Sequence, residues 1–397
     1  MHEHPHEAVP ADARDGIMLA VLWPLGVVAA GIAVYLNSFA GSFLFDDVNQ
    51  ILGNVRIRDL GWPWPFLAAR RPLVELSLAV NYALHHFELF GYHAVNLTVH
   101  LLAAVVLYAL VRRTLRRAPL SDRYAGIATH IAGVVALFWV VHPLQTQAVT
   151  YLIQRSESLM ALLYLLTLYF ASVAADARRP AIWQTLCVIA CGLGMTAKAV
   201  MITAPLMVLL YDRAFIAGSF RDALVRRARL YTALAGTWLI LWLCGVAPAV
   251  LGLTDRPAHV GFGFKGVGPL EYGLTQFGVL TRYLRLAFWP RPLCLDYDWP
   301  VADSAWQVIA PMIFIFAVIG LVIRTFTRHP RLAFPLVGFF VILAPTSTIV
   351  PIRDPIFEHR LYLPLAGIIT LLVLSGHAGL SALARWASWD NAMTGRV

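Results

Sequence analysis

Residues 17–39, IMLAVLWPLGVVAAGIAVYLNSF, contain no charged side chain and are long enough to cross a bilayer as one helix. Of the 397 residues, 59% are hydrophobic and only 13% are charged, against about 25% charged in an ordinary soluble domain. So few charges cannot cover a soluble globule, which excludes a cytosolic enzyme, a secreted disulfide domain and a disordered chain. We predict an all-α polytopic membrane protein.

Apolar runs like the first recur along the chain. The predicted spans are 17–39, 92–111, 125–141, 158–175, 182–197, 199–211, 230–252, 304–323, 332–346 and 361–376. The connections at 112–123, 178–179, 213–229 and 324–331 are rich in arginine. Short basic connections stay on the cytoplasmic side. We therefore predict about 10 transmembrane helices with both termini inside.

A parity argument decides how the segment 269–290 lies. If it crossed the membrane, the basic connection at 324–331 would fall outside. The segment also contains Arg282 and Arg285. We therefore predict a helix that lies at or dips into the outer face without crossing, like the interfacial helices predicted in the first outer loop, 40–91.

The predicted domain organisation is simple. It consists of a cytoplasmic tip at 1–16, a transmembrane catalytic domain at 17–376 and a short interfacial or cytoplasmic tail at 377–397. No internal repeat is visible, and the four cysteines show neither disulfide nor zinc spacing. The net charge of +9 fits membrane lipid and topology rather than nucleic acid.

The fifth and sixth spans are short, because residues 181–210 must supply two crossings and a turn. Fifteen residues of helix reach only ~22 Å, against a hydrocarbon core of ~30 Å. The turn near Lys198 is therefore expected below the outer surface. A lysine there either snorkels to the interface or binds a phosphate inside a polar cavity.

The first outer loop begins with Asp46 and Asp47, immediately after the first span. A carboxylate at a membrane exit can act as a general base toward a hydroxyl, or it can simply cap a turn. A divalent metal is possible there but not required, since two carboxylates are too few ligands to argue for one. No cofactor is certain.

Other polar residues cluster in and beside the outer loops, where they either bind a substrate or hold helices together. They are Arg71, His93, Asn96, His142, Tyr151, Arg155, Glu157, Glu358, His359 and Arg360. No nucleotide-binding or hydrolase motif is present. An enzyme of this kind must therefore use a donor that is already activated and reachable from the membrane.

Together these motifs resemble the membrane part of the TMTC-like O-mannosyltransferases, of the GT-C glycosyltransferase superfamily. The matching stretches are FDDVNQILGN, RRPLVELSLAVNYALHHFELFGYHAVNLTVH, HPLQTQAVTYLIQRSESL, AKAVMITAPLMVLLYD, YLRLAFWPRPLCLDYDWP and PTSTIVPIRDPIFEHRLYLPLAG, in family order. The resemblance implies a GT-C-like helical bundle. It also implies inverting transfer of mannose or a related hexose from an undecaprenyl- or dolichyl-type phosphate to a protein or glycan hydroxyl.

The resemblance also implies roles for individual residues. Asp46 matches the catalytic base and Asp47 its acidic neighbour. His142, Arg155 and Glu157 match the second outer loop, and Lys198 and Arg360 match basic positions that would bind the donor phosphate. From their place in the outer-loop clusters, we also expect Arg155 and Arg71 to be donor-phosphate ligands. The expected donor or acceptor contacts are His142, Glu157, Asn96, His93, Tyr151, His359 and Glu358.

The sequence departs from the family pattern in three ways. Gln147 and Ala199 stand where many relatives have Glu, which puts the donor-sugar contacts in doubt. The usual C-terminal tetratricopeptide repeats are not seen, so the loops or a partner protein would have to recognise the acceptor.

Two other classes of function stay open. One is a transporter or flippase for polyprenyl-linked sugars, and the other is an inactive GT-C-like assembly subunit. The residues that fill these motifs favour a protein of a bacterial inner membrane, with the active site on the periplasmic side.

Overall fold

The computed structural model describes residues 11–61, 69–253 and 260–394, and within these ranges the chain is helical without a strand. This confirms the predicted all-α fold. The elements of the first half are α1 (Ala11–Tyr35), η1 (Leu36–Ala40), η2 (Val48–Leu52), η3 (Val55–Arg58), α3 (Pro72–His85), α4 (Leu89–Leu115), α5 (Ser121–Tyr124), α6 (Ala128–Val141), η4 (Pro143–Gln145), α7 (Thr146–Thr150), η5 (Leu152–Gln154), α8 (Arg155–Ala174) and α9 (Pro180–Met195).

The second half continues in the same way. Its elements are η6 (Ala199–Thr203), α10 (Ala204–Phe215), α11 (Phe220–Arg226), α12 (Ala228–Gly236), α13 (Trp238–Leu243), α14 (Val246–Val250), α15 (Pro269–Phe288), α16 (Ala305–Arg328), α17 (Pro330–Leu343), η7 (Glu358–Leu361) and α18 (Leu365–Thr394). Proline stands first in α3, α9, α15 and α17, where its missing N–H leaves no helical hydrogen bond unmade.

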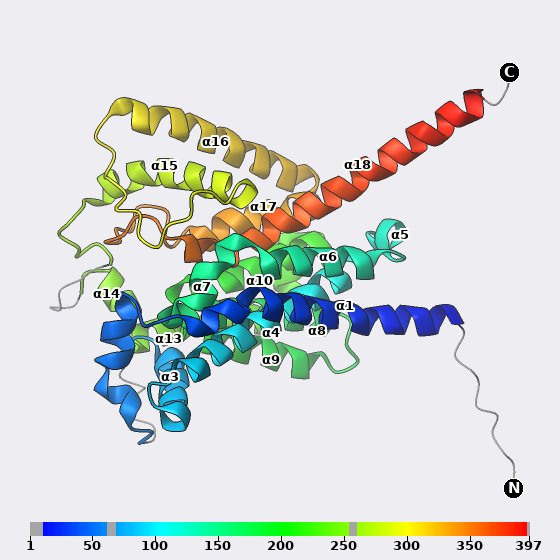
Figure 1. Cartoon of the computed structure of the whole chain (residues 1–397). Coiled ribbons are helices and arrows are strands. Elements are labelled where there is room, and N and C mark those ends of the chain that lie inside the picture. Colours follow the sequence, from blue (N-terminus) through cyan, green and yellow to red (C-terminus); the bar gives the residue numbers. More distant parts are fainter. Residues whose placement is uncertain (1–10, 62–68, 254–259, 395–397) are drawn as a thin grey trace, which may run out of the picture.

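Helices α4, α6 and α8 form the centre of the bundle, with α1, α9 and α10 packed around them (Figure 1). The indole of the fully buried Trp139 on α6 donates to the backbone carbonyl of Tyr362. Gly133 lets α1 approach α6 closely, since a Cβ atom there would lie 2.1 Å from the ring of Trp23. Only glycine fits such a contact without moving the indole.

Apolar helices coincide with all of the predicted spans, but their lengths differ. Among the described residues, five helices are long and apolar enough to cross a membrane, and seven if each bent pair counts as one span. The remaining apolar helices are shorter, at Pro180–Met195, Ala228–Leu243 and Pro330–Leu343. The multi-pass architecture is therefore confirmed, whereas the number ten stays a prediction.

Helix α15 occupies the predicted segment, and it lies alongside α16 (Figure 1). The chain that follows α15 doubles back along it. Arg282 donates to the carbonyl of Pro292 at 3.1 Å, and the N–H of Ala302 donates to Thr275 Oγ1 at 3.0 Å. The chain thus returns to the end of the bundle where α15 began, as the parity argument requires.

The C-terminal segment differs from the prediction. We expected a span ending near 376 and a separate interfacial tail, but α18 runs without a break to Thr394. No proline interrupts residues 365–394, so the helical hydrogen bonds continue past the apolar part. In Figure 1, α18 ends and α1 begins at the same end of the bundle, which agrees with the prediction that both termini share a side.

The predicted orientation can be tested with the exposed Cys294, which lies in the segment after α15. In sealed right-side-out vesicles, a membrane-impermeant maleimide should label Cys294. It should label an Arg178→Cys, Cys294→Ala variant only after the vesicles are permeabilised, because Arg178 is exposed in a predicted cytoplasmic connection. Labelling of both positions from the same side would contradict the orientation.

Candidate active site

Asp46 stands exposed at the start of the first outer loop. Phe45 before it has φ +44°, a left-handed conformation that is unusual for an aromatic residue and costs about 1 kcal/mol or more. The backbone N–H of Asp46 donates to the hydroxyl of the buried Tyr151 at 2.9 Å. The turn therefore fixes the backbone of Asp46 and leaves its carboxylate facing outward.

The neighbouring Asp47 is buried and has a different role. One of its carboxylate oxygens accepts from the N–H of Leu44 at 3.1 Å, and the other accepts from the N–H of Ile153 at 2.8 Å. Burial raises the pKa of Asp47 to about 6. Asp47 thus ties the first outer loop to η5, and we assign it a structural rather than a catalytic role.

Arg155 is also fully buried, at the start of α8. Its Nε donates to Asn96 Oδ1 at 2.6 Å, and its two terminal nitrogens donate to the carbonyls of Ser77 and Tyr92 at 3.2 and 3.1 Å. Asn96 in turn donates to two carbonyls, of Val149 and Leu152. These contacts join α3, α4 and α8, so we revise the predicted phosphate-binding role of Arg155 and the ligand-binding role of Asn96 to structural ones.

Lys198 and Glu157 form an ion pair near the same end of the bundle. The side chain of Lys198, between α9 and η6, is 12% exposed, and that of Glu157, in the first turn of α8, is 2% exposed. Lys198 also donates to Gln154 Oε1 at 3.4 Å. The chain bends at this point because α9 ends at Met195, as the shortness of the two spans predicted. Pairing with Glu157 offsets the cost of placing the ammonium group so deep.

Further cations surround this ion pair. Burial and the charges of Lys198, Arg360 and Arg71 hold the pKa of His359 well below its ordinary value, so the imidazole is neutral. Burial lowers the pKa of Arg71, while the charge of Glu157 acts in the opposite direction. Among the described residues, no carboxylate lies within ion-pair distance of Arg71 or Arg360. The cluster therefore has an excess of positive charge, which favours an anionic ligand.

An acidic group lies on the side of Asp46. Burial raises the pKa of Asp354, and the negative charges of Asp296 and Asp46 contribute to the shift. These residues come from the segment after α15, the segment before η7 and the first outer loop. Nothing in the sequence spacing of Asp296 and Asp354 predicts that these three segments meet. These carboxylates lie next to the cations, since Arg360 donates to the backbone carbonyl of Asp354 at 2.7 Å and the charge of Asp46 acts on Arg71.

Three other predicted site residues contact neighbouring loops and helices of the protein itself. Glu358 accepts from the N–H of Cys294 and the hydroxyl of Tyr297, both at 2.6 Å, and so holds the segment after α15 against η7. His142 accepts from the N–H of Leu144 at the start of η4. His93 is buried beside Phe39 and Gly41. Their contacts with donor or acceptor stay predictions, and neither ring nitrogen of the buried His93 has a hydrogen-bond partner in the described part of the chain.

A metal at Asp46 and Asp47 stays a prediction, and each oxygen of Asp47 already accepts one backbone N–H. No group of three or more His, Cys, Asp or Glu suited to a metal ion occurs in the described part of the chain.

Three relatives of the chain are all named protein O-mannosyl-transferases. Human TMTC4, a protein O-mannosyl-transferase, is 25% identical over 93% of this chain and 56% of its own length. The protein O-mannosyl-transferase F38B6.6 of Caenorhabditis elegans is 24% identical over 88% of this chain and 50% of its own. Tmtc3 of Drosophila melanogaster, a protein O-mannosyl-transferase, is 32% identical over 44% of this chain and 22% of its own.

The chain is a relative of the TMTC protein O-mannosyltransferases. This confirms the resemblance seen in the motifs. The chain spans about half the length of human TMTC4 and of the worm protein. No protein-family model and no solved structure matches the chain.

Replacing Asp47 should reveal its structural role and its pH dependence. Asp47→Ala leaves two buried N–H groups without acceptors, so the melting temperature in detergent should fall, by the equivalent of roughly 1–3 kcal/mol for each group. The raised pKa means that the folded protein binds a proton more tightly than the unfolded chain does. The contribution of Asp47 to stability should therefore grow as the pH falls from 7 to 4.

The measurement is the difference in melting temperature between wild type and Asp47→Ala, taken at pH 4.5 and 7.5. We expect the larger difference at pH 4.5. A larger difference at pH 7.5 would mean that the ionised carboxylate is the stabilising form, against the burial seen here.

Arg155 offers a second structural test. Arg155→Leu removes the donor to Asn96 and to two carbonyls in the core, and each buried acceptor left without a partner costs roughly 1–3 kcal/mol. We expect a clear fall in melting temperature. Arg229→Gln, at an exposed position with the same charge, is the control and should change little. An Arg155→Leu protein as stable as this control would return Arg155 to the candidate ligands.

Proposed function

We propose that the chain is a membrane glycosyltransferase that transfers mannose or a related hexose from a polyprenyl phosphate to a Ser/Thr or glycan hydroxyl, with inversion. The single observation that carries the proposal is the arrangement of the site. An exposed, backbone-anchored Asp46 lies within electrostatic reach of Arg71, which belongs to a cationic cluster with Lys198 and Arg360. The names of the relatives support the same reaction class.

The cationic cluster of Lys198, Arg71 and Arg360 suits the polyprenyl phosphate, which is the leaving group. When the bond between the anomeric carbon and the phosphate oxygen breaks, the electron pair stays on the phosphate, and its negative charge grows. Preorganised cations stabilise such a charge most effectively where water is excluded. Lys198 and Arg360 are held by other groups of the fold, Glu157 and two carbonyls respectively, so they need not reorganise when the donor arrives.

The carboxylate of Asp46 suits the acceptor hydroxyl. A hydroxyl that attacks the anomeric carbon loses its proton, and a carboxylate within hydrogen-bond reach can accept it. Asp46 is exposed, whereas Asp47 is buried and fully hydrogen-bonded. Attack from the Asp46 side, opposite the departing phosphate, would invert the configuration of the sugar carbon.

The setting of the reaction belongs to the same proposal. We place the site on the outer face of a bacterial inner membrane, which would make an undecaprenyl-type phosphate the donor carrier. The outer loops 40–91, 142–157, 253–303 and 345–360 would then face the periplasm. The relatives named above are from animals, where a dolichyl-type carrier would take the same place.

The test is glycosyl transfer by purified protein from a panel of polyprenyl-phosphate sugars to a Ser/Thr-rich peptide. Asp46→Asn keeps the size of the side chain and removes the base, so transfer should fall at least ~100-fold. Asp59→Asn changes an exposed carboxylate in the same loop and should leave transfer unchanged.

The competing functions predict different results for the same purified protein. If no donor is consumed but lipid-linked sugar crosses the membrane of proteoliposomes, the chain is a transporter. If the protein binds donor without transfer or transport, the chain is an inactive subunit. Equal transfer by wild type and Asp46→Asn would move the base to another residue, with Asp354 the first candidate.

A further inference from the structure

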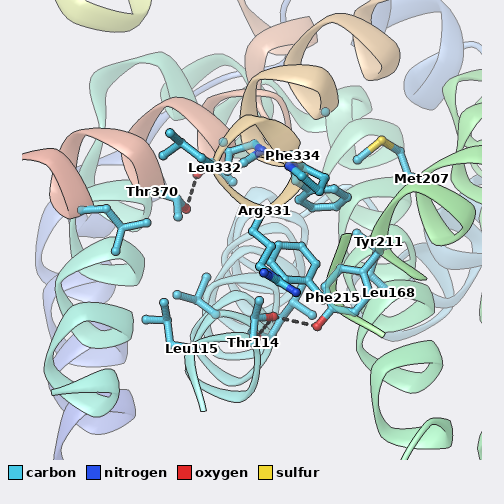
Figure 2. Close-up of a pocket in the computed structure, with 18 of the residues that line it drawn as sticks. Thr114, Leu115, Leu168, Met207, Tyr211, Phe215, Arg331, Leu332, Phe334 and Thr370 are labelled. Atoms are coloured by element: carbon cyan, nitrogen blue, oxygen red, sulfur yellow. Dashed lines mark hydrogen bonds between the residues drawn. The ribbon is translucent and has the colours of Figure 1, made fainter. Parts of the chain in front are cut away.

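A separate, mostly apolar pocket lies away from the site, between α4, α8, α10, α17 and α18. Its volume is about 500 Å³. Leucines and aromatic rings line most of it, and Thr114 and Tyr211 hydrogen-bond to each other at 2.8 Å on its wall. Figure 2 shows Arg331 pointing into this pocket, toward Thr114 and Phe215. The proposed transfer reaction does not use this space.

The cations that line the pocket come from two connections. Arg123 lies in the short α5 after α4, Arg328 ends α16, and Arg331 lies in the first turn of α17. No carboxylate is among the lining residues. Arg328 and Arg331 have no hydrogen-bond or ion-pair partner in the part of the chain that the structure describes. The pocket thus combines apolar walls with unpaired positive charge.

Other arginines of the same connections do have partners. Arg113 and Arg117 both pair with Asp176, at 2.8 and 2.6 Å, and Arg227 pairs with Asp212 at 2.8 Å. Arg328 and Arg331 differ from these paired arginines because they line an apolar pocket that has no carboxylate among its lining residues. An apolar cavity with unpaired cations complements a ligand that has hydrocarbon chains and an anionic head.

The place of the cations selects among such ligands. Both connections belong to the set that the positive-inside rule assigns to the cytoplasmic side. The donor phosphate is proposed at Lys198 and Arg360, toward the other face. A polyprenyl donor would therefore have its charge far from Arg331, whereas a phospholipid of the cytoplasmic leaflet would have its charge beside it.

We propose that this pocket binds an anionic phospholipid of the cytoplasmic leaflet. Its phosphate contacts Arg328 and Arg331, with Arg123 nearby, and an acyl chain lies between α4, α17 and α18. The inference does not depend on the transfer reaction, because a transporter or an inactive subunit with this fold would have the same pocket.

The experiment is native mass spectrometry of the delipidated full chain, titrated with phosphatidylglycerol or with phosphatidylcholine of the same acyl chains. Wild type should prefer phosphatidylglycerol. Each arginine near the lipid surface contributes about a fivefold preference, so Arg328→Gln with Arg331→Gln should lose roughly 25-fold. The control is Arg324→Gln with Arg221→Gln, which removes two exposed charges that do not line the pocket.

A second variant keeps all the charges. Thr370 lines the pocket from α18 and hydrogen-bonds only to the carbonyl of Ala366 in its own helix. Thr370→Phe should fill the pocket and weaken phosphatidylglycerol binding without changing the melting temperature of the lipid-free protein.

Three results would overturn the proposal. They are equal retention of the two lipids by wild type, equal loss in the two double variants, or displacement of phosphatidylglycerol by undecaprenyl phosphate in wild type but not in Thr370→Phe. The last result would make the pocket a site for the polyprenyl chain.

Discussion

The ion pair between Lys198 and Glu157 is the interaction on which the proposed site depends. An unpaired ammonium group among apolar helices would cost several kcal/mol, so Lys198 can stand there only with Glu157 in the first turn of α8 opposite it. The pair requires α9 to end early, at Met195. It also sets the charge balance of the site, since Glu157 offsets one cation and leaves Arg71 and Arg360 in excess.

The two neighbouring carboxylates of the first outer loop divide structure and chemistry between them. One oxygen of Asp47 binds the loop to Ile153 of η5 and the other binds Leu44 within the loop, and these contacts hold the turn at Phe45 in its left-handed conformation. Asp46 is thereby presented outward, with its N–H on Tyr151. A structural carboxylate next to a reactive one explains why the two are adjacent, and why a metal is not needed to account for the pair.

The sequence predicted the helical class well because composition and apolar length decide it. Charge parity, a constraint on the whole chain, predicts that the segment 269–290 does not cross the membrane. The chain after α15 doubles back along it, while the membrane side stays a prediction. The sequence could not separate ligands from scaffold. Arg155 and Lys198 look alike as intramembrane cations, and only the structure shows that the first is bonded to Asn96 and two carbonyls while the second is near other cations. The proximity of Asp354 to Asp46 and Asp296 could not be read from the sequence, because the three residues come from separate loops.

Binding of undecaprenyl phosphate without its sugar tests most directly the claim that the cationic cluster exists for a lipid phosphate. The informative variant is Lys198→Gln with Glu157→Gln, which removes both charges and leaves no unpaired ion in the bundle. Equilibrium binding should weaken at least tenfold relative to wild type, while the melting temperature of the free protein stays within a few degrees. Binding as tight as that of wild type would show that the pair serves only the packing of α8 against α9, and would contradict the account.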